Sequence, residues 1–465
     1  MAEIIKNKNK IIFFNLLSTI VLQGLTFFAA PIFSSVLGTA NYGIVSVYNT
    51  WVSIFSTVCS LQAASTIALA RSNYKLEEQE KYQSSVLSMA VLIYIIFATA
   101  SLLLLSKWKE QIGLTGWMLP LALLQGLGNY CVTIINSKFT YEFKAVQNFL
   151  LSVCLSIFNI GLSLVLITQF SGDNNYWGRI IGQVVSYLLF GLFAYFFIFI
   201  RGRTLYNKNY WKFSLPIAFP TVFHLLAGLL LGQSDRLMIQ QFLDNSSVGI
   251  YTLAASFSIV IQSIWVAFNN SWAPFYYEYT RLNQIEEMKK KAQNYVELFS
   301  VITCGFILLS KEVYHLFADP RYWDGTMFVP MFALGYYFVF MYSFPVNFEF
   351  YHKKTKPIAV ATTIAAFFNI VLNFFMIKKY GILGAVIATT IAHGLQFLCH
   401  LIFAKKMITK EFPFELTFFI PGFTMVFICL MGNYFITDFT IVRWAIGFLI
   451  GVFELYKIVK RKSIF

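Results

Sequence analysis

The chain has 465 residues, of which 58% are hydrophobic and only 12% are charged. A soluble domain carries about 25% charged residues, so this composition cannot coat a soluble surface of that size. It excludes a secreted enzyme, a cytosolic enzyme and a disordered scaffold. In a soluble protein the net charge of +14 would point to nucleic acid. Here it indicates basic loops facing an anionic leaflet, and we expect no nucleic-acid partner.

Long apolar runs predict about fourteen transmembrane helices, because each span needs about 20 mostly apolar residues. The first follows a polar, basic N-terminus and has no clear cleavage site, so it is interpreted as a span rather than a signal peptide. The fold class is therefore an all-α integral membrane protein. The predicted spans lie near 11–37, 44–70, 84–106, 116–137, 146–169, 176–200, 214–234, 249–273, 295–318, 326–350, 357–377, 382–404, 415–435 and 441–459.

Most of the 35 Lys and Arg residues fall in alternate loops, beginning with the N-terminus and ending with the C-terminal tail. The positive-inside rule makes these segments cytoplasmic, with both termini inside. The longest, 274–294, is expected to be a solvated connector. No loop is large enough for a catalytic domain, and the chain has no P-loop. The six cysteines are scattered singly through apolar runs. We therefore expect no enzyme, no cofactor, no metal site and no use of ATP.

Short motifs recur about 210 positions apart, which is the signature of an internal repeat. They predict two six-helix lobes, 1–206 and 207–412, followed by two extra helices and a basic cytoplasmic tail in 413–465. Because each lobe has an even number of helices, both insert with the same orientation. Such parallel repeats are typical of transporters with a substrate path between lobes. The paired motifs are Phe158-Asn159-Ile160-Gly161-Leu162 with Phe368-Asn369-Ile370-Val371-Leu372, Gly178 with Gly384, and Asn41-Tyr42-Gly43-Ile44 with Ser247-Val248-Gly249-Ile250.

Three of the motif regions resemble one known family. They are Gln233-Ser234-Asp235-Arg236-Leu237-Met238-Ile239, the run from Lys354 through Asn373 to Thr389, and Gly38-Thr39-Ala40-Asn41-Tyr42-Gly43. They are similar to the Wzx-type polysaccharide flippases of the multidrug/oligosaccharidyl-lipid/polysaccharide exporter superfamily, which have a MATE-like fold. The resemblance runs along nearly the whole chain.

The resemblance implies a multi-pass transporter of the bacterial cytoplasmic (inner) membrane. Its substrate would be an undecaprenyl-pyrophosphate-linked oligosaccharide repeat unit, moved from the cytoplasmic to the outer leaflet by alternating access for capsule, O-antigen or exopolysaccharide synthesis. Membrane lipids would surround it, and a polysaccharide polymerase that removes the product outside is a candidate partner. We expect the chain to act as a monomer.

A sugar head group cannot cross hydrocarbon unless polar groups replace its water. Polar side chains at i, i+4 spacing follow one face of several predicted helices. The alternative for these amides is hydrogen bonding between packed helices, and Asn159, Asn369 and Asn373 are interpreted in that way. The uncharged candidates for the substrate path are Asn15, Gln23, Asn49, Asn129, Asn136, Asn269 and Asn270.

Four titratable residues complete the candidate path. Arg71 lies at a predicted cytoplasmic helix end, where it is either a phosphate contact or a positive-inside anchor. Asp235 and Arg236 lie at a predicted outer helix end, as a local ion pair, a gate element or ligands. His224 lies at mid-membrane, four residues after Pro220, where an ionisable group is a functional hypothesis by default. Arg179 is expected only to snorkel to the outer interface.

Four other functions are alternatives. A cation-coupled multidrug exporter of the same superfamily is expected to have a buried carboxylate, yet no Asp or Glu falls at the centre of predicted helices one to eight. A polymerase, ligase or glycosyltransferase needs a sizeable outer loop or an acidic motif. A lipid II flippase is expected to carry basic residues deep in its first two helices. A scaffold does not explain the polar faces. The multidrug exporter is the main alternative.

Overall fold

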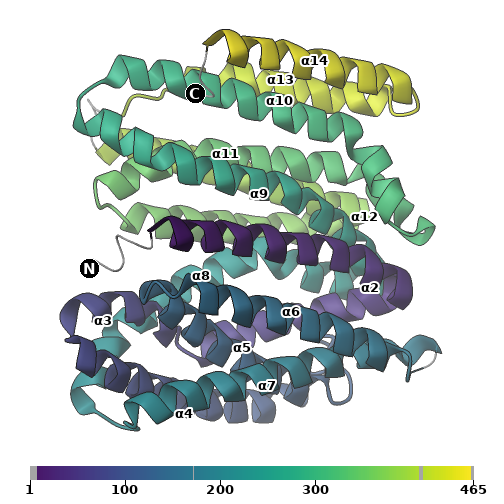
Figure 1. Cartoon of the computed structure of the whole chain (residues 1–465). Coiled ribbons are helices and arrows are strands. Elements are labelled where there is room, and N and C mark those ends of the chain that lie inside the picture. The colour runs from purple at the N-terminus through teal and green to yellow at the C-terminus, as the bar shows by residue number, and fades with distance from the viewer. Residues whose placement is uncertain (1–7, 171, 408–411, 462–465) are drawn as a thin grey trace. The chain divides into compact units, whose positions relative to one another are not determined.

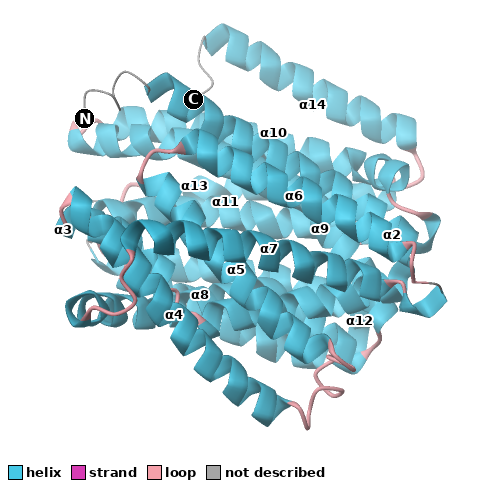
Figure 2. Ribbon diagram, turned by 60° about the horizontal axis from the view of Figure 1, so that its bottom comes forward, coloured by secondary structure: helices cyan, strands magenta, loops and turns pink. Residues whose placement is uncertain are grey.

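The computed structural model describes residues 8–170, 172–407 and 412–461. Over these residues the chain is helical, and no strand is found (Figure 2). Ten of the described helices are long and apolar enough to cross a membrane. The predicted all-α, multi-span architecture is confirmed. Most of the basic N-terminus and the last four residues lie outside the described part.

The chain divides into two compact units, Met1–Gly249 and Ile250–Phe465. Helix α9 starts in the last residues of the first unit and continues into the second (Figure 1). The first unit holds α2 (Lys8–Cys59), η1 (Ala63–Thr66), α3 (Ile67–Asn73), α4 (Leu76–Leu105), α5 (Met118–Tyr141), α6 (Ala145–Ile167), η2 (Gly172–Asn174), α7 (Tyr176–Gly202) and α8 (Lys208–Phe242). The second holds most of α9 (Asn245–Arg281), then α10 (Ile285–Phe317), η3 (Pro320–Met327), α11 (Val329–Tyr351), α12 (Lys356–Met407), α13 (Leu416–Phe435) and α14 (Thr440–Arg461).

Two of the longest helices each contain two predicted spans. Helix α2 breaks at Gly38, where φ is 75°, and α12 breaks at Gly381, where φ is 60°. Glycine adopts these angles readily because it has no Cβ. With the two breaks, each of the fourteen predicted spans coincides with a helix of the described part, although α10 and α14 are not among the ten helices apolar enough to cross a membrane.

The segment 274–294, predicted as a solvated connector, is exposed at 281–284 but is helical over most of its length. Helix α9 continues to Arg281 and α10 begins at Ile285, so only three residues lie between them. Ion pairs one turn apart line both extensions: Arg281 with Glu278 at 2.5 Å, and Lys289 with Glu286 at 2.9 Å. Pairs at this spacing stabilise helices in water by a few tenths of a kcal/mol, about 0.2–0.5 each.

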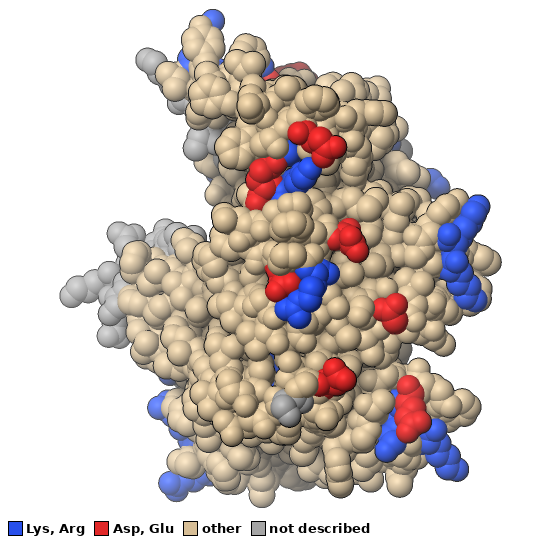
Figure 3. Space-filling model, turned by 90° about the vertical axis from the view of Figure 1, so that its right-hand side faces the viewer, with Lys and Arg blue, Asp and Glu red and all other residues tan. Residues whose placement is uncertain are grey.

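Each unit has its own apolar core. In the second unit the core is largely aromatic, and the rings of Phe299 and Phe340 stack with centroids 4.2 Å apart. Many large apolar side chains remain exposed, including Leu104, Phe193 and Phe448. Exposed apolar side chains of this kind suit contact with lipid. Figure 3 draws the side where the helices of Figure 1 end, and on it charged side chains are sparse, some in red–blue groups and others alone.

Candidate functional site

The first half of α2 carries an exposed polar stripe. The side chains of Asn15, Thr19, Gln23 and Thr26 are all exposed, as their spacing along one helix face predicts. The two threonine hydroxyls donate to the backbone carbonyls of Asn15 and Leu22, at 3.0 and 2.8 Å. The threonines therefore need no partner helix, and the amide groups of the stripe remain available to a ligand.

A second polar face lies on α5. Thr133 and Thr140 are exposed, whereas Asn129 and Asn136 are half-buried. Both hydroxyls donate to the backbone carbonyls of these asparagines, at 2.9 and 2.8 Å. The side-chain oxygen of Asn136 has no hydrogen-bond partner among the described residues. Asn49, in the second half of α2, is also half-buried.

Helix α8 presents a strip of four residues spaced by one turn each, His224, Gly228, Gly232 and Arg236. His224 is exposed, and both glycines face open space. Arg236 donates to the carbonyl of Gly232 at 3.2 Å. The strip thus places an imidazole and a guanidinium at the two ends of a bare stretch of backbone. Asp235, the neighbour of Arg236, is buried with 1% of its surface exposed.

The two predicted asparagines of α9 differ in their surroundings. Asn269 accepts a hydrogen bond from the amide of Asn347 in α11, at 3.0 Å. Asn270 is exposed. The bond favours helix packing as the role of Asn269, which leaves Asn270 as the residue of this pair that a ligand can reach.

A small open pocket lies at the predicted cytoplasmic end of the first unit. Arg71 stands over the ring of Phe143, with its guanidinium carbon 5.1 Å from the ring centre. The pocket therefore combines one cation with amide, phenol and carboxylate groups. Its lining is Ile67, Ala70, Arg71, Gln79, Tyr82, Gln83, Tyr141 and Glu142.

A charged network that the sequence did not predict lies beside this pocket, and its Gln83 and Glu142 belong to the pocket lining. The ammonium group of Lys138, whose side chain is 1% exposed, donates to Gln83 at 2.5 Å and to Glu142 at 2.6 Å. Glu142 also pairs with Lys144 at 2.6 Å. Burial alone would raise the pKa of Glu142, but the hydrogen bonds from the two lysines outweigh burial and hold its pKa below the usual 4.5. The i, i+4 spacing of Lys138 and Glu142 was the available sequence signal.

Arg179 does not snorkel outwards as expected. Its guanidinium donates to the side chains of Asn159 at 2.9 Å and Ser163 at 2.7 Å, both in α6, and lies 3.8 Å from the ring centre of Phe33 in α2. Asn159 therefore joins α6 to α7, which confirms its structural interpretation. The reason for the error is local: position in the span predicts depth, whereas the neighbouring helix decides the direction of the side chain.

Asn369 and Asn373, also interpreted as packing residues, make such contacts in the second unit. The amide of Asn369 donates to Thr389 at 3.2 Å, across the break in α12, and Asn373 donates to Asn369 at 3.1 Å. The donor and the acceptor of the bond between Asn369 and Thr389 are twenty residues apart, as are Asn159 and Arg179.

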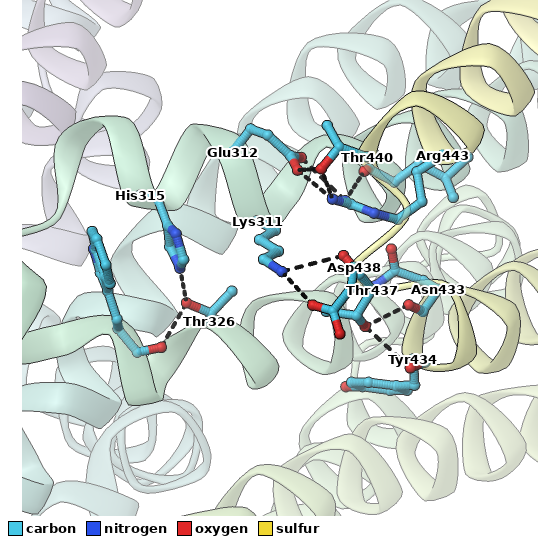
Figure 4. Close-up of polar contacts among 12 residues, drawn as sticks. Lys311, Glu312, His315, Thr326, Asn433, Tyr434, Thr437, Asp438, Thr440 and Arg443 are labelled. Atoms are coloured by element: carbon cyan, nitrogen blue, oxygen red, sulfur yellow. Dashed lines mark hydrogen bonds and ion pairs between the residues drawn. The ribbon is translucent and has the colours of Figure 1, made fainter.

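At the predicted outer end of the second unit, a polar network ties α10 to α14 and to the turn before it (Figure 4). Arg443, with 1% of its side chain exposed, pairs with Glu312 and donates to the carbonyl of Leu308 at 2.7 Å. Lys311 pairs with Asp438 at 3.0 Å. His315 bonds to Thr326 at 2.9 Å. These contacts join the ends of neighbouring helices and point to a structural brace rather than to a ligand site.

The chain was compared with known proteins. A family model described as "Polysaccharide biosynthesis protein" matches residues 9–279, more than half of the chain. The "Lsg locus putative protein 1" of Haemophilus influenzae is 24% identical over 390 residues, covering 77% of this chain and 90% of that protein. An "Uncharacterized membrane protein" of the same organism is 21% identical over 378 residues, covering 79% and 87%.

Two solved structures show the fold. The lipid II flippase MurJ, in an inward closed conformation, has a TM-score of 0.72 at 18% identity and covers 97% of this chain and 99% of its own. An inward-facing multidrug resistance MATE transporter of the MOP superfamily has a TM-score of 0.64 at 15% identity, covering 83% and 94%. At such identities the likeness concerns the fold alone. With the family match over more than half of its length, the chain belongs to the family of polysaccharide biosynthesis proteins, and it has the fold of the MurJ and MATE transporters.

Proposed function

We propose that the chain is a flippase that moves undecaprenyl-pyrophosphate-linked oligosaccharide repeat units from the cytoplasmic to the outer leaflet by alternating access. It would lie in the bacterial inner membrane with both termini inside. The observation that carries the proposal is the exposed polar stripe of α2, formed by Asn15, Thr19, Gln23 and Thr26, within a helix apolar enough to span a membrane.

An exposed polar stripe is costly in lipid. Amides that face hydrocarbon find no water to bond, and each unsatisfied group costs several kcal/mol, roughly 2–7 by transfer measurements. The same groups in a water-filled cavity cost little and can bond sugar hydroxyls. We therefore assign the stripe to the polar path, together with the asparagines of α5.

The cations of the first unit suit the charged part of such a substrate. Arg71 would receive a phosphate at the cytoplasmic end. His224 and Arg236 would offer further contacts along α8, where the two intervening glycines leave room for a bulky group. Guanidinium groups suit phosphate because they donate in a fixed fork.

The proposed lobes 1–206 and 207–412 are supported by contacts that repeat. Gly178 lies tight against the backbone of Ile167, and Gly384 lies tight against that of Met376. Gly43 lies against the carbonyl of Asn245, and Gly249 lies against the carbonyl of Thr39. Gly249 is the repeat equivalent of Gly43, and Asn245 is the repeat equivalent of Thr39, so the two contacts correspond to each other. A local two-fold axis produces reciprocal contacts of this kind.

The test is a leaflet assay in a cell that makes such a polymer. On depletion of the protein, the lipid-linked repeat unit should collect on the cytoplasmic face and polymer should be lost, with both restored by the gene. Normal polymer and leaflet distribution, with raised sensitivity to cationic drugs, would favour the multidrug exporter and overturn the proposal.

Variants then test the path itself. His224→Ala and Arg236→Ala should reduce transport without loss of membrane insertion. Phe219→Ala, at an exposed apolar position on the same helix, is the matched control and should transport as wild type does. Full activity of both path variants would remove these residues from the site.

A further inference from the structure

A carboxyl group and an imidazole are buried together in the second unit, outside the proposed path. Glu349 lies near the end of α11, and His400 lies in the second half of α12. The carboxylate oxygen Oε2 of Glu349 is 2.9 Å from Nδ1 of His400. Both residues have 0% of their surface exposed. The remaining oxygen of Glu349 and Nε2 of His400 have no hydrogen-bond partner among the described residues.

The burial restricts the number of protons that this pair can hold. With one proton the pair is net neutral, either as an acid beside a neutral imidazole or as a carboxylate beside an imidazolium. With no proton it carries −1, and with two protons it carries +1. An isolated charge in a dry interior is costly even after relaxation, and the loss of one partner of a buried pair leaves such a charge. The pair with one proton is the form without net charge.

The charged groups described on the elements packed against the pair are paired with other groups or exposed. The ring of Tyr342, in α11, stacks on His400 with centroids 5.5 Å apart. Glu297 of α10 is paired with Lys457 and Arg461 of α14, Glu278 of α9 is paired with Arg281, and Lys405 and Lys406 of α12 are exposed. Other titratable groups on these elements include Tyr276 and Tyr277 of α9, Tyr295 of α10, Arg321, Tyr322 and Asp324 of η3, Tyr336, Tyr337 and Tyr351 of α11, His393 and Cys399 of α12, and Cys429 and Tyr434 of α13.

We propose that Glu349 and His400 form a proton-binding site that holds α11 against α12 while it carries one proton, and that gains or loses a proton only when this interface opens to water. The site would couple opening of the second unit to proton exchange. It does not depend on which substrate the chain moves.

The test is hydrogen exchange of the purified full chain in lipid nanodiscs, followed by mass spectrometry across a range of pH. Rates are divided by the intrinsic rate of the same peptides at each pH. In the wild type, exchange over 340–351 and 396–404 should be slowest at intermediate pH. It should rise on both the acid and the alkaline side, approaching tenfold per pH unit, because one proton is linked to each opening.

Two variants separate the rise in exchange on the acid side, the acid limb, from the rise on the alkaline side, the alkaline limb. His400→Gln leaves only Glu349, which is neutral when protonated, so the acid limb should disappear. Glu349→Gln leaves only His400, which is neutral when deprotonated, so the alkaline limb should disappear. Glu278→Gln, in an exposed pair with Arg281, is the control and should keep both limbs. Flat exchange in the wild type overturns the proposal, even if one variant fails to fold. So does a variant that keeps the limb it should lose.

Discussion

Gly43 and Gly249 lie tight against the backbone of a neighbouring helix, and enlarging either should separate two helices. A Cβ added at Gly43 would lie 1.8 Å from the carbonyl oxygen of Asn245, and one added at Gly249 would lie 2.1 Å from that of Thr39. A Cβ approaches other heavy atoms no closer than about 3 Å, so each substitution must move the backbone by roughly 1 Å. Overpacking of this kind costs about 1–3 kcal/mol.

Helix propensity acts in the opposite direction and sets the control. Alanine is favoured over glycine by about 1 kcal/mol in a helix interior. Gly24→Ala adds a methyl group where nothing lies within 4 Å, so that variant should be at least as stable as wild type. Gly43→Ala and Gly249→Ala should both be less stable, because the clash is with backbone and outweighs the propensity.

The assay is the thermal midpoint of the purified chain in nanodiscs. Because both glycines belong to one reciprocal contact, the double variant should lose less than the sum of the single losses. The first methyl group will already have separated the helices, so the second methyl group meets a smaller clash. If Gly43→Ala melted with or above Gly24→Ala, the close approach would not exist and the reasoning would be refuted.

Two further predictions concern the buried charges. Arg443→Met leaves Glu312 without its cationic partner, with the Thr440 hydroxyl as a remaining donor, and should cost about 3 kcal/mol. Arg321→Met, which removes an exposed pair with Asp319, should cost about 0–1 kcal/mol; equal melting points would contradict this. Glu142→Gln should also destabilise the chain at pH 7, by about 3 kcal/mol, since it leaves the buried Lys138 with Gln83 and with Glu80, whose carboxylate is 4.0 Å away. The pKa of Glu142 is lowered in the folded chain, so its contribution is present above its unfolded pKa and lost as pH falls through the folded one. The gap between variant and wild type, measured by thermal melting, should therefore narrow below about pH 4; a gap independent of pH would exclude the ionised pair.

Much of the fold could be predicted because the signals are local. The length of each apolar run fixes whether a helix can span a bilayer, and the glycines at 38 and 381 fall between predicted spans, where the helices break. The spacing of Asn15, Thr19, Gln23 and Thr26, at i, i+4, i+8 and i+11, predicts that they share one helix face. The prediction of a long connector at 274–294 missed these helical turns because ion pairs extend the helices beyond the apolar run.

The sequence by itself therefore determined the membrane-spanning helices, the repeated motifs and the polar faces, since each depends on neighbours within a few turns. Tertiary structure alone decided which polar groups meet. Glu349 and His400 are 51 residues apart, and Arg443 and Glu312 are 131 apart. Asn269 is bonded while Asn270 is exposed, although nothing in their local sequence separates them. The direction of a side chain around its helix follows from the backbone, but its partner follows from the helix packed against it, and that packing depends on contacts spread over the whole unit.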